Sequence, residues 1–120
     1  MNPATPLFTF PKEARILARR EFLLLQQRGK KRHGQYFLVI TAPGRTQRSR
    51  LGITTSRRFG KSVDRNRMKR LLREFFRERQ HALVPAVDLV IIPKVGAHEL
   101  SFLQVDAELE RLLSLAKRAS

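Results

Sequence analysis

One stretch, VDRNRMKRLLREFFRER at residues 63–79, constrains the fold of this chain more than any other. Seven of its seventeen residues are Lys or Arg, yet its apolar residues recur at the spacing of a helix. A helix over 65–79 carries on one face the apolar residues Met68, Leu71, Leu72, Phe75 and Phe76. An apolar stripe of this width has to be buried against other elements. The stretch therefore predicts an amphipathic helix packed on a sheet.

The opposite side of this helix is basic and carries Asn66, Lys69, Arg70, Arg73 and Arg77. Like charges at i,i+4 each cost a helix about 0.2–0.5 kcal/mol, and the helix dipole disfavours cations in the N-terminal half. Only Asp64 is placed to cap the helix start, by side chain and by charge. The basic residues therefore do not stabilise the helix itself, whereas an RNA phosphate backbone would offset their repulsion and release counterions on binding.

Two other interpretations of this helix are a solvated charged surface and a basic amphipathic helix that lies on a membrane. Solvated surfaces usually mix both signs of charge, and here one sign dominates. A membrane-surface helix places its apolar face in lipid, whereas this face continues the pattern of a globular core. The pattern therefore favours nucleic acid as the partner.

The net charge of +15 is confined to the first two thirds of the chain. Residues 1–80 hold 21 Lys or Arg against five Asp or Glu, and residues 81–120 hold four against five. There is no Cys, which excludes thiolate zinc sites, disulfides and thiol nucleophiles. No apolar run approaches the ~18 residues of a membrane span, and MNPATPLFTFPKE lacks the order of a secretory signal. We expect a cytoplasmic protein with a polyanionic partner.

The chain length suits one RNA-binding α+β domain over residues 12–120, preceded by an extended lead-in over 1–11. In the lead-in, Phe8 and Phe10 either pack on the domain or belong to a mobile tail. The local patterns predict a helix over 13–28, a basic loop at 30–32 and strands over 35–42, 50–56 and 87–93. We expect the first two strands to pair as a hairpin, and the helices to cover a small sheet.

The last helix has a clear start in the sequence. Ser101 and Gln104 have the spacing of a capping box, and Leu100 with Val105 has that of a hydrophobic staple. The core-facing stripe that follows comprises Phe102, Val105, Leu109, Leu112, Leu113 and Ala116.

The segment SRRFGKSVDRNRMKRLLREFFR, residues 56–77, resembles the signature of the bacterial ribonuclease P protein subunit. Its centre is the run Arg65-Asn66-Arg67, followed by Lys69-Arg70 and Arg73-Glu74. FPKEARILARREF resembles the family's earlier segment, and DLVIIP resembles the strand before the last helix. The similarity covers about residues 10–116, with the segments in the family's order.

The resemblance implies a two-layer α+β sandwich of αβββαβα order, with a small mixed sheet. It also implies an unusual left-handed βαβ crossover through the basic helix, against the general right-handed rule. In this family the protein binds the catalytic RNA and the single-stranded 5′ leader of precursor tRNA, and assists endonucleolytic 5′ maturation at low Mg²⁺. The RNA is the catalyst, and Mg²⁺ acts through it. We therefore expect no catalytic residue, metal or cofactor on the protein, and a monomer when RNA is absent.

The resemblance also implies site residues. The residues expected to bind the RNA subunit are Arg57, Arg58, Lys61, Arg65, Asn66, Arg67, Lys69, Arg70 and Arg73. Phe22 and Lys94 match leader-cleft positions, although Phe22 is also compatible with a plain core role. Strand alternation favours Phe37 in the cleft and Tyr36 in the core, because the set that includes Phe37 ends in a polar residue. Gln26 stands where the family often has a second aromatic residue, and Val39 stands where some members carry Tyr, so leader stacking is expected to be weaker or rearranged.

Two alternatives from other classes remain at this point. A structural rRNA-binding protein of ribosomal type has similar size and charge, but it needs no leader cleft. A protein nuclease would need a metal site or a carboxylate pair. His33, His81 and His98 are isolated in the sequence, with no metal-ligand spacing among them. A phosphate-binding loop of the GxxxxGK type is also absent from the sequence. His33, next to the basic loop, is placed where it could touch RNA.

Overall fold

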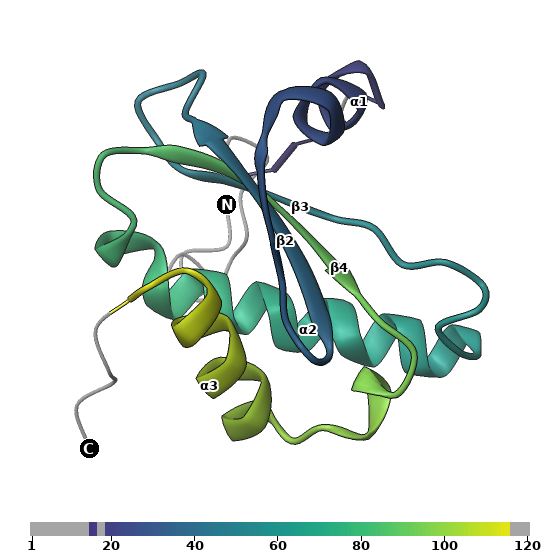
Figure 1. Cartoon of the computed structure of the whole chain (residues 1–120). Helices are drawn as coiled ribbons and strands as arrows, with labels where there is room; N and C mark the ends of the chain where they lie inside the picture. Colours follow the sequence, from purple (N-terminus) through teal and green to yellow (C-terminus); the bar gives the residue numbers. More distant parts are fainter. Residues whose placement is uncertain (1–14, 17–18, 116–120) are drawn as a thin grey trace, which may run out of the picture.

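The computed structural model describes residues 15–16 and 19–115. The predictions for the lead-in, for Phe8 and Phe10, for the first residues of the helix predicted over 13–28 and for Ala116 lie outside these residues. The elements are α1 (Arg19–Arg28), β1 (Lys30–His33), β2 (Phe37–Pro43), β3 (Arg50–Ile53), α2 (Ser62–Arg79), β4 (Val87–Pro93) and α3 (Phe102–Leu112). Short 3₁₀ turns, η2 (Gln80–Ala82) and η3 (Ala97–Glu99), follow α2 and β4. The predicted αβββαβα order is confirmed (Figure 1).

The four strands form one mixed sheet in the order β1-β2-β4-β3. β2 runs antiparallel to β1 and β4, and β3 runs parallel to β4, to which it is joined through α2. The expected hairpin between 35–42 and 50–56 is therefore wrong, because β4 lies between those two strands. β4 is a short, nearly continuous apolar strand buried on both faces, and such a strand belongs in the centre of a sheet.

The segment predicted as a basic loop, residues 30–32, is instead the edge strand β1. It pairs with β2 over its whole length, from Lys30 opposite Thr41 to His33 opposite Leu38. All four of its residues are exposed, so it lacks the apolar alternation by which a strand is recognised in a sequence.

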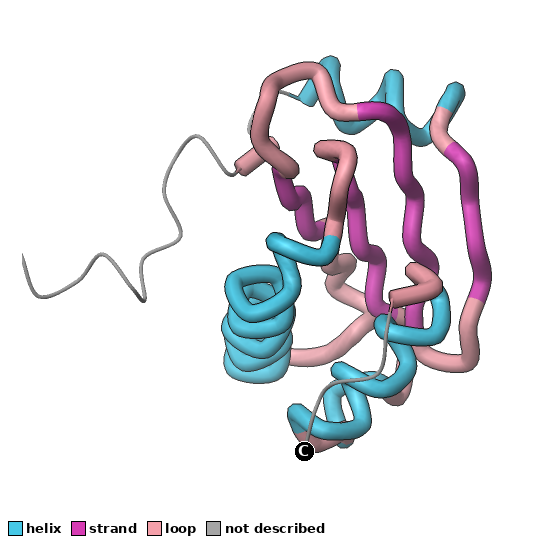
Figure 2. The backbone as a smooth tube through the Cα atoms, turned by 90° about the vertical axis from the view of Figure 1, so that its left-hand side faces the viewer, coloured by secondary structure: helices cyan, strands magenta, loops and turns pink. Residues whose placement is uncertain are grey.

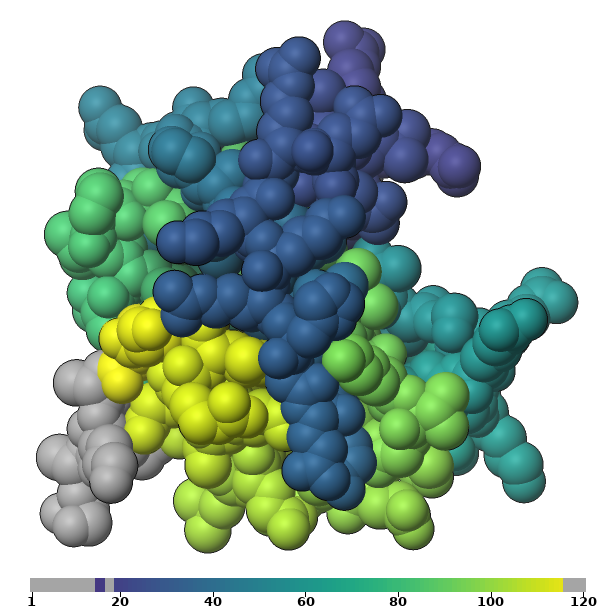
Figure 3. Space-filling model, viewed as in Figure 1, coloured from purple at the N-terminus to yellow at the C-terminus, as the bar shows by residue number. Residues whose placement is uncertain are grey.

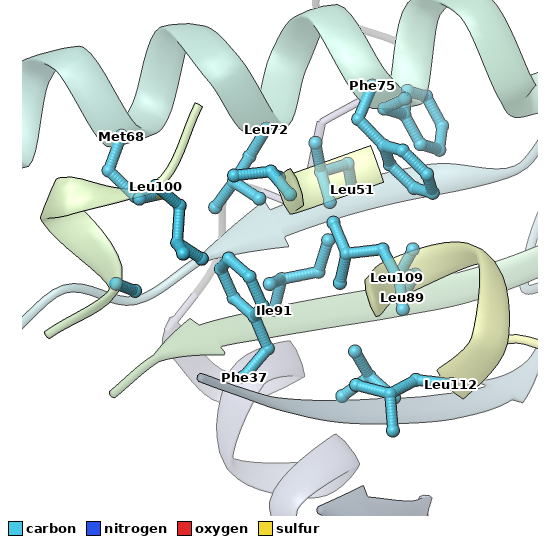
Figure 4. Close-up of a cluster of buried hydrophobic side chains, with 14 of the residues drawn as sticks. Phe37, Leu51, Met68, Leu72, Phe75, Leu89, Ile91, Leu100, Leu109 and Leu112 are labelled. Atoms are coloured by element: carbon cyan, nitrogen blue, oxygen red, sulfur yellow. The ribbon is translucent and has the colours of Figure 1, made fainter. Parts of the chain in front are cut away.

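Helices cover both faces of the sheet, with α2 and α3 on one face and α1 on the other (Figures 1 and 2). The larger core lies between the sheet and the α2–α3 layer (Figure 4). Its fully buried side chains include Phe37, Met68, Leu72, Phe75, Leu89 and Leu109. A smaller cluster of Ile16, Leu25, Ile40 and Val90 lies beneath α1. The apolar face predicted for the basic helix is thus buried as expected.

The orientation predicted for β2 is wrong. Phe37 is fully buried in the larger core, and Val39 is buried there as well. Leu38 and Ile40 point to the α1 side instead. The alternate residues Phe37, Val39 and Thr41 end in a polar side chain, but this does not mark an open face, because helices cover both faces of the sheet. Tyr36, which precedes the strand, is half-buried against the same larger core.

The helix starts follow local chemistry to different degrees. At α3 the predicted capping box is confirmed: Ser101 Oγ accepts from the Gln104 N–H at 3.2 Å, and Gln104 Oε1 accepts from the Ser101 N–H at 2.9 Å. α2 starts three residues earlier than predicted, and the Asp64 carboxylate reaches back to accept the Lys61 N–H at 3.3 Å. Among the described residues α1 runs from Arg19, and Arg15, which lies in the range predicted as helix, instead forms an isolated parallel bridge with Leu51.

Buried ion pairs tie the helices to the sheet and to each other. Arg50 on β3 donates to Asp88 on β4 at 2.8 Å and to Glu21 on α1 at 2.9 Å. Hydrogen bonds to Asp88 and Glu21 raise the pKa of Arg50 above its usual value, so it stays charged. These ion pairs thus fix α1 relative to β3 and β4. Within the described residues, no helix is long and apolar enough to span a membrane.

Candidate nucleic-acid interface

The exposed side of α2 is the first part of the candidate interface. Met68, Leu72, Phe75 and Phe76 hold the opposite side in the core, so the orientation of the helix is fixed. Of the predicted RNA-binding residues on α2, Asn66, Arg70 and Arg73 are exposed, and Lys69 is half-buried beside them. These side chains lie on successive turns of one helix face. The result is a rigid row of donors about one helical turn apart.

The basic loop before α2 continues this surface. Arg57, Arg58 and Lys61 are all exposed. Between them, Phe59 is only 2% exposed and belongs to the larger core. Its ring meets the His98 ring edge to face, with centroids 5.8 Å apart. Phe59 was not singled out in the sequence, yet it is the anchor that holds the three loop cations beside the start of α2. Its position between charged residues is the signal that could have identified it.

Arg65 and Arg67 have a different role from their neighbours. Arg65 folds back to donate to Gly60 O at 2.7 Å and to Ser62 Oγ at 3.1 Å. Arg67 donates to the main-chain carbonyls of His98 and Leu100, at 2.9 Å each. Both side chains are half-buried, and both guanidinium groups bind backbone of the protein itself. The structure thus places Arg67 as a tether between α2 and the segment before α3, and its replacement is expected to affect folding.

The second part of the candidate interface is a groove between α1, β3 and α2. One hollow of about 560 Å³ is lined by Phe22, Gln26, Thr54 and Lys69, among others. A smaller hollow of about 190 Å³ continues past Phe22 and Lys69 to Arg73. The groove therefore has one aromatic ring on its α1 side and two cations of the basic helix on the other. A single strand needs this combination of stacking and charge.

The predicted leader-binding residues are not all brought together. Phe22 lines both hollows, half-buried over Gly52. Phe37 is buried on the other face of the sheet and cannot contribute. Lys94 follows β4, where its Nζ donates to Gly34 O at 2.8 Å, and it lines neither hollow. The groove takes its cations from α2 instead, which brings Lys69 and Arg73 next to Phe22.

The acidic residues are distributed so that they leave this surface positive. Asp106 and Glu110 pair with Arg79, whose pKa is lowered by burial but raised overall by its hydrogen bonds to the two carboxylates. Glu74 and Glu78 pair with Arg77 at the far end of α2. The side chains that have no hydrogen-bond or ion-pair partner among the described residues include Arg57, Arg58, Lys69 and Arg70. These cations are available for an anionic partner.

The described residues contain no cluster of three or more His, Asp or Glu side chains that could hold a metal ion. His33 is exposed on β1, and His98 is half-buried against Phe59. The groove is bordered by cations, while Glu74, Glu78, Asp106 and Glu110 are held in ion pairs with Arg77 and Arg79.

Comparison with known proteins finds one family over most of the chain. The family model described as Ribonuclease P matches residues 10–117. The ribonuclease P protein component of Desulfatibacillum aliphaticivorans is 37% identical over 113 residues, which covers 94% of this chain and 96% of that protein. The corresponding protein of Thermotoga maritima is 38% identical over 112 residues, covering 92% and 95% of the two chains.

Solved structures show the same fold. A Staphylococcus aureus RNase P protein mutant with defective mRNA degradation activity superposes with a TM-score of 0.79 at 30% identity, covering 86% of this chain and 87% of that one. The RNase P protein of Thermotoga maritima in complex with 1-(4-fluorophenyl)-2-thiourea gives a TM-score of 0.74 at 36% identity, covering 82% and 96%. Both likenesses extend over more than four fifths of each chain.

Proposed function

The chain belongs to the ribonuclease P protein family, and we propose that it binds the catalytic RNA of ribonuclease P through α2 and the loop before it. As a family member, it is a protein component of the ribonucleoprotein enzyme that processes tRNA. Family membership also decides against the ribosomal-type alternative. The finer assignments that follow, to RNA segments and to individual residues, are the proposal.

The observation that carries the proposal is a group of four cations without partners in the described part of the chain, two on the N-terminal half of α2 and two on the loop before it. Lys69 and Arg70 on the helix, with Arg57 and Arg58 on the loop, have no hydrogen-bond or ion-pair partner among the described residues. Cations without ion-pair partners break no internal ion pair when they meet phosphates, and they release counterions from the RNA on binding. Like charges on α2 repel one another, but the burial of its apolar face in the core keeps the helix folded.

The groove between α1, β3 and α2 takes the single-stranded 5′ leader of precursor tRNA in this proposal. Phe22 offers a ring for base stacking, and Lys69 and Arg73 neutralise the backbone of the strand. Gln26, which also lines the groove, offers no ring, so stacking in this proposal relies on Phe22 alone. Stacking and charge do not select bases, which suits leaders of many sequences.

Cleavage in this proposal is carried out by the RNA, with Mg²⁺ bound by the RNA. The protein contributes by reducing the repulsion between two polyanions, the catalytic RNA and its substrate. Its effect should then be greatest at low Mg²⁺ and should fade as Mg²⁺ takes over the screening. If raising Mg²⁺ left the requirement for the protein unchanged, this electrostatic role would be refuted.

The binding proposal is tested by titrating the protein into ribonuclease P RNA and, separately, into a ribosomal RNA fragment of equal length. We expect tighter binding to ribonuclease P RNA at near-physiological salt, with a logarithmic affinity that falls linearly with the logarithm of salt concentration. Equal affinity for the two RNAs would mean that the surface binds RNA without choosing its partner, and would overturn the assignment.

A further inference from the structure

The edge strand β1 carries a second basic surface that α2 does not explain. All four of its residues, Lys30 to His33, are exposed. Arg28, at the end of α1 just before the strand, is exposed as well. β1 and β3 are the two edges of the sheet, and α2 packs near β3. Figure 2 shows the strand that follows α1 on the side of the sheet away from α2.

The side chains of β1 point to both faces of the sheet. Lys31 and His33 lie opposite Ile40 and Leu38, which face α1. Lys30 and Arg32 lie opposite Thr41 and Val39, on the face that α3 covers. The charge therefore surrounds the edge of the sheet instead of lying on one of its faces. Figure 3 shows the blue segment that contains β1 on the face of the molecule that is turned to the viewer.

These cations are not neutralised within the described part of the chain. None of Lys30, Lys31 and Arg28 has a side-chain partner there. Arg32 donates to Leu112 O at 3.1 Å and to Ser114 Oγ at 2.9 Å, neither of which carries charge. The nearby Glu108 carboxylate accepts the N–H groups of Tyr36 and Phe37, at 2.8 and 3.0 Å. The edge thus concentrates positive charge with no acidic residue committed to it.

Protection of a sheet edge against aggregation is the simplest explanation of charge on an edge strand. A short strand and one or two Lys residues achieve that protection. Here three consecutive residues, Lys30, Lys31 and Arg32, are basic and exposed, and Arg28 adds to them. Like charges at such density repel one another and lower stability, which a nearby polyanion would reverse. The positive charge of Arg28 and β1 is greater than edge protection requires, which indicates a binding role.

We propose that Arg28 and β1 form a second RNA-binding surface, which contacts the phosphate backbone of a segment of ribonuclease P RNA distinct from the segment bound by α2. This inference rests on the proposed function. The two surfaces lie at opposite edges of a molecule about 35 Å across, so a large folded RNA is the partner that reaches both. The leader groove is lined by α1, β3 and α2 and by no residue of β1, which places the substrate elsewhere. Lys and Arg contacts to phosphate would orient the protein on the RNA without reading its sequence.

The first test is the salt dependence of RNA binding by the double variant Lys30→Gln, Lys31→Gln. Arg32 is left in place because it also bonds the end of α3. We expect the slope of log affinity against log salt to flatten by about 1.5 units, with an unchanged melting temperature. Arg111→Gln, an exposed charge on α3, is the matched control, and its slope should stay near that of the wild type. A double variant that behaves like this control would overturn the proposal.

The second test locates the contact on the RNA. The chain has no Cys, so Lys31→Cys and Arg70→Cys each provide one attachment point for an iron–EDTA group that cleaves nearby RNA. We expect the two variants to cleave different segments of ribonuclease P RNA. Three outcomes would overturn the second RNA-binding surface and leave the proposed function intact. They are cleavage of the same segment by both variants, cleavage of precursor tRNA alone, and no cleavage from position 31 while position 70 cleaves. Absence of cleavage from both positions, with no RNA binding by the wild type, would refute the proposed function itself.

Discussion

The ring of Phe22 lies directly against Gly52 of β3, so that a Cβ added at Gly52 would stand 2.7 Å from Phe22 Cζ. The close approach of these two residues sets the floor and one wall of the groove between α1 and α2. It also explains why β3 has a glycine at a buried position of a strand, where glycine is usually unfavourable. The shape of the groove thus depends on the absence of a side chain.

Gly52→Ala is predicted to displace the Phe22 ring and to weaken leader binding. The affinity of the holoenzyme for precursor tRNA with a leader should fall, while its affinity for mature tRNA should stay the same. Overpacking should also cost about 1–3 kcal/mol of folding free energy. Phe22→Ala, which removes the ring without crowding, is the companion variant. Equal losses for substrates with and without a leader, in both variants, would show that the groove does not hold the leader.

Arg70→Ala is predicted to weaken binding to the RNA subunit without a change in stability. Arg70 is exposed and has no partner among the described residues, so its removal takes away about one phosphate contact and about one unit of salt slope. Fluorescence titration at several salt concentrations measures this slope. An unchanged slope would remove Arg70 from the interface.

Arg67→Ala is predicted to act in the opposite way. It removes two hydrogen bonds to the carbonyls of His98 and Leu100, and the loss should cost about 1–3 kcal/mol of stability. Arg67→Lys, which keeps the charge but not the forked geometry, should restore only part of that stability. Thermal melting of both variants checks the prediction. A variant that melts like the wild type but binds RNA weakly would place Arg67 in the interface after all.

Asp88→Ala is predicted to be the most destabilising of the ion-pair substitutions. Asp88 is 1% exposed, and its loss leaves the Arg50 guanidinium buried with Glu21 alone, at a cost of about 3–5 kcal/mol. Glu21→Ala should cost less, because Glu21 is more exposed and Arg50 keeps Asp88. Urea unfolding measures both. Equal costs would mean that the pair across β3 and β4 is not the main anchor of Arg50.

The sequence was informative where local pattern and tertiary structure agree. The strand over 87–93 and the start of the last helix at Ser101 were predicted to the residue, because an apolar run and a capping box leave few alternatives. The buried face of the basic helix followed from its 3.6-residue period. The family resemblance added a third strand before that helix, which the residues themselves did not indicate.

Features that depend on distant parts of the chain were missed. β1 is a strand because β2 offers it an edge, although its own residues favour a loop. The side of the sheet that Phe37 faces could not be inferred from a polar residue at the strand end when both faces are covered. Arg67 appears identical to its basic neighbours in the sequence, and only the position of the His98–Leu100 backbone makes it a tether. Side-chain type gives the chemistry of a site, while tertiary structure decides which of the residues are available.

The central claim is that the protein assists a catalytic RNA, and cleavage of precursor tRNA at low, near-physiological Mg²⁺ tests it most directly. The reaction is run with a bacterial ribonuclease P RNA alone, with the protein alone, and with both together. The account predicts substantial cleavage only when both are present. Cleavage by the protein alone would contradict it by revealing an active site on the protein, and an RNA whose activity is unchanged by the protein would contradict it by removing the cofactor role.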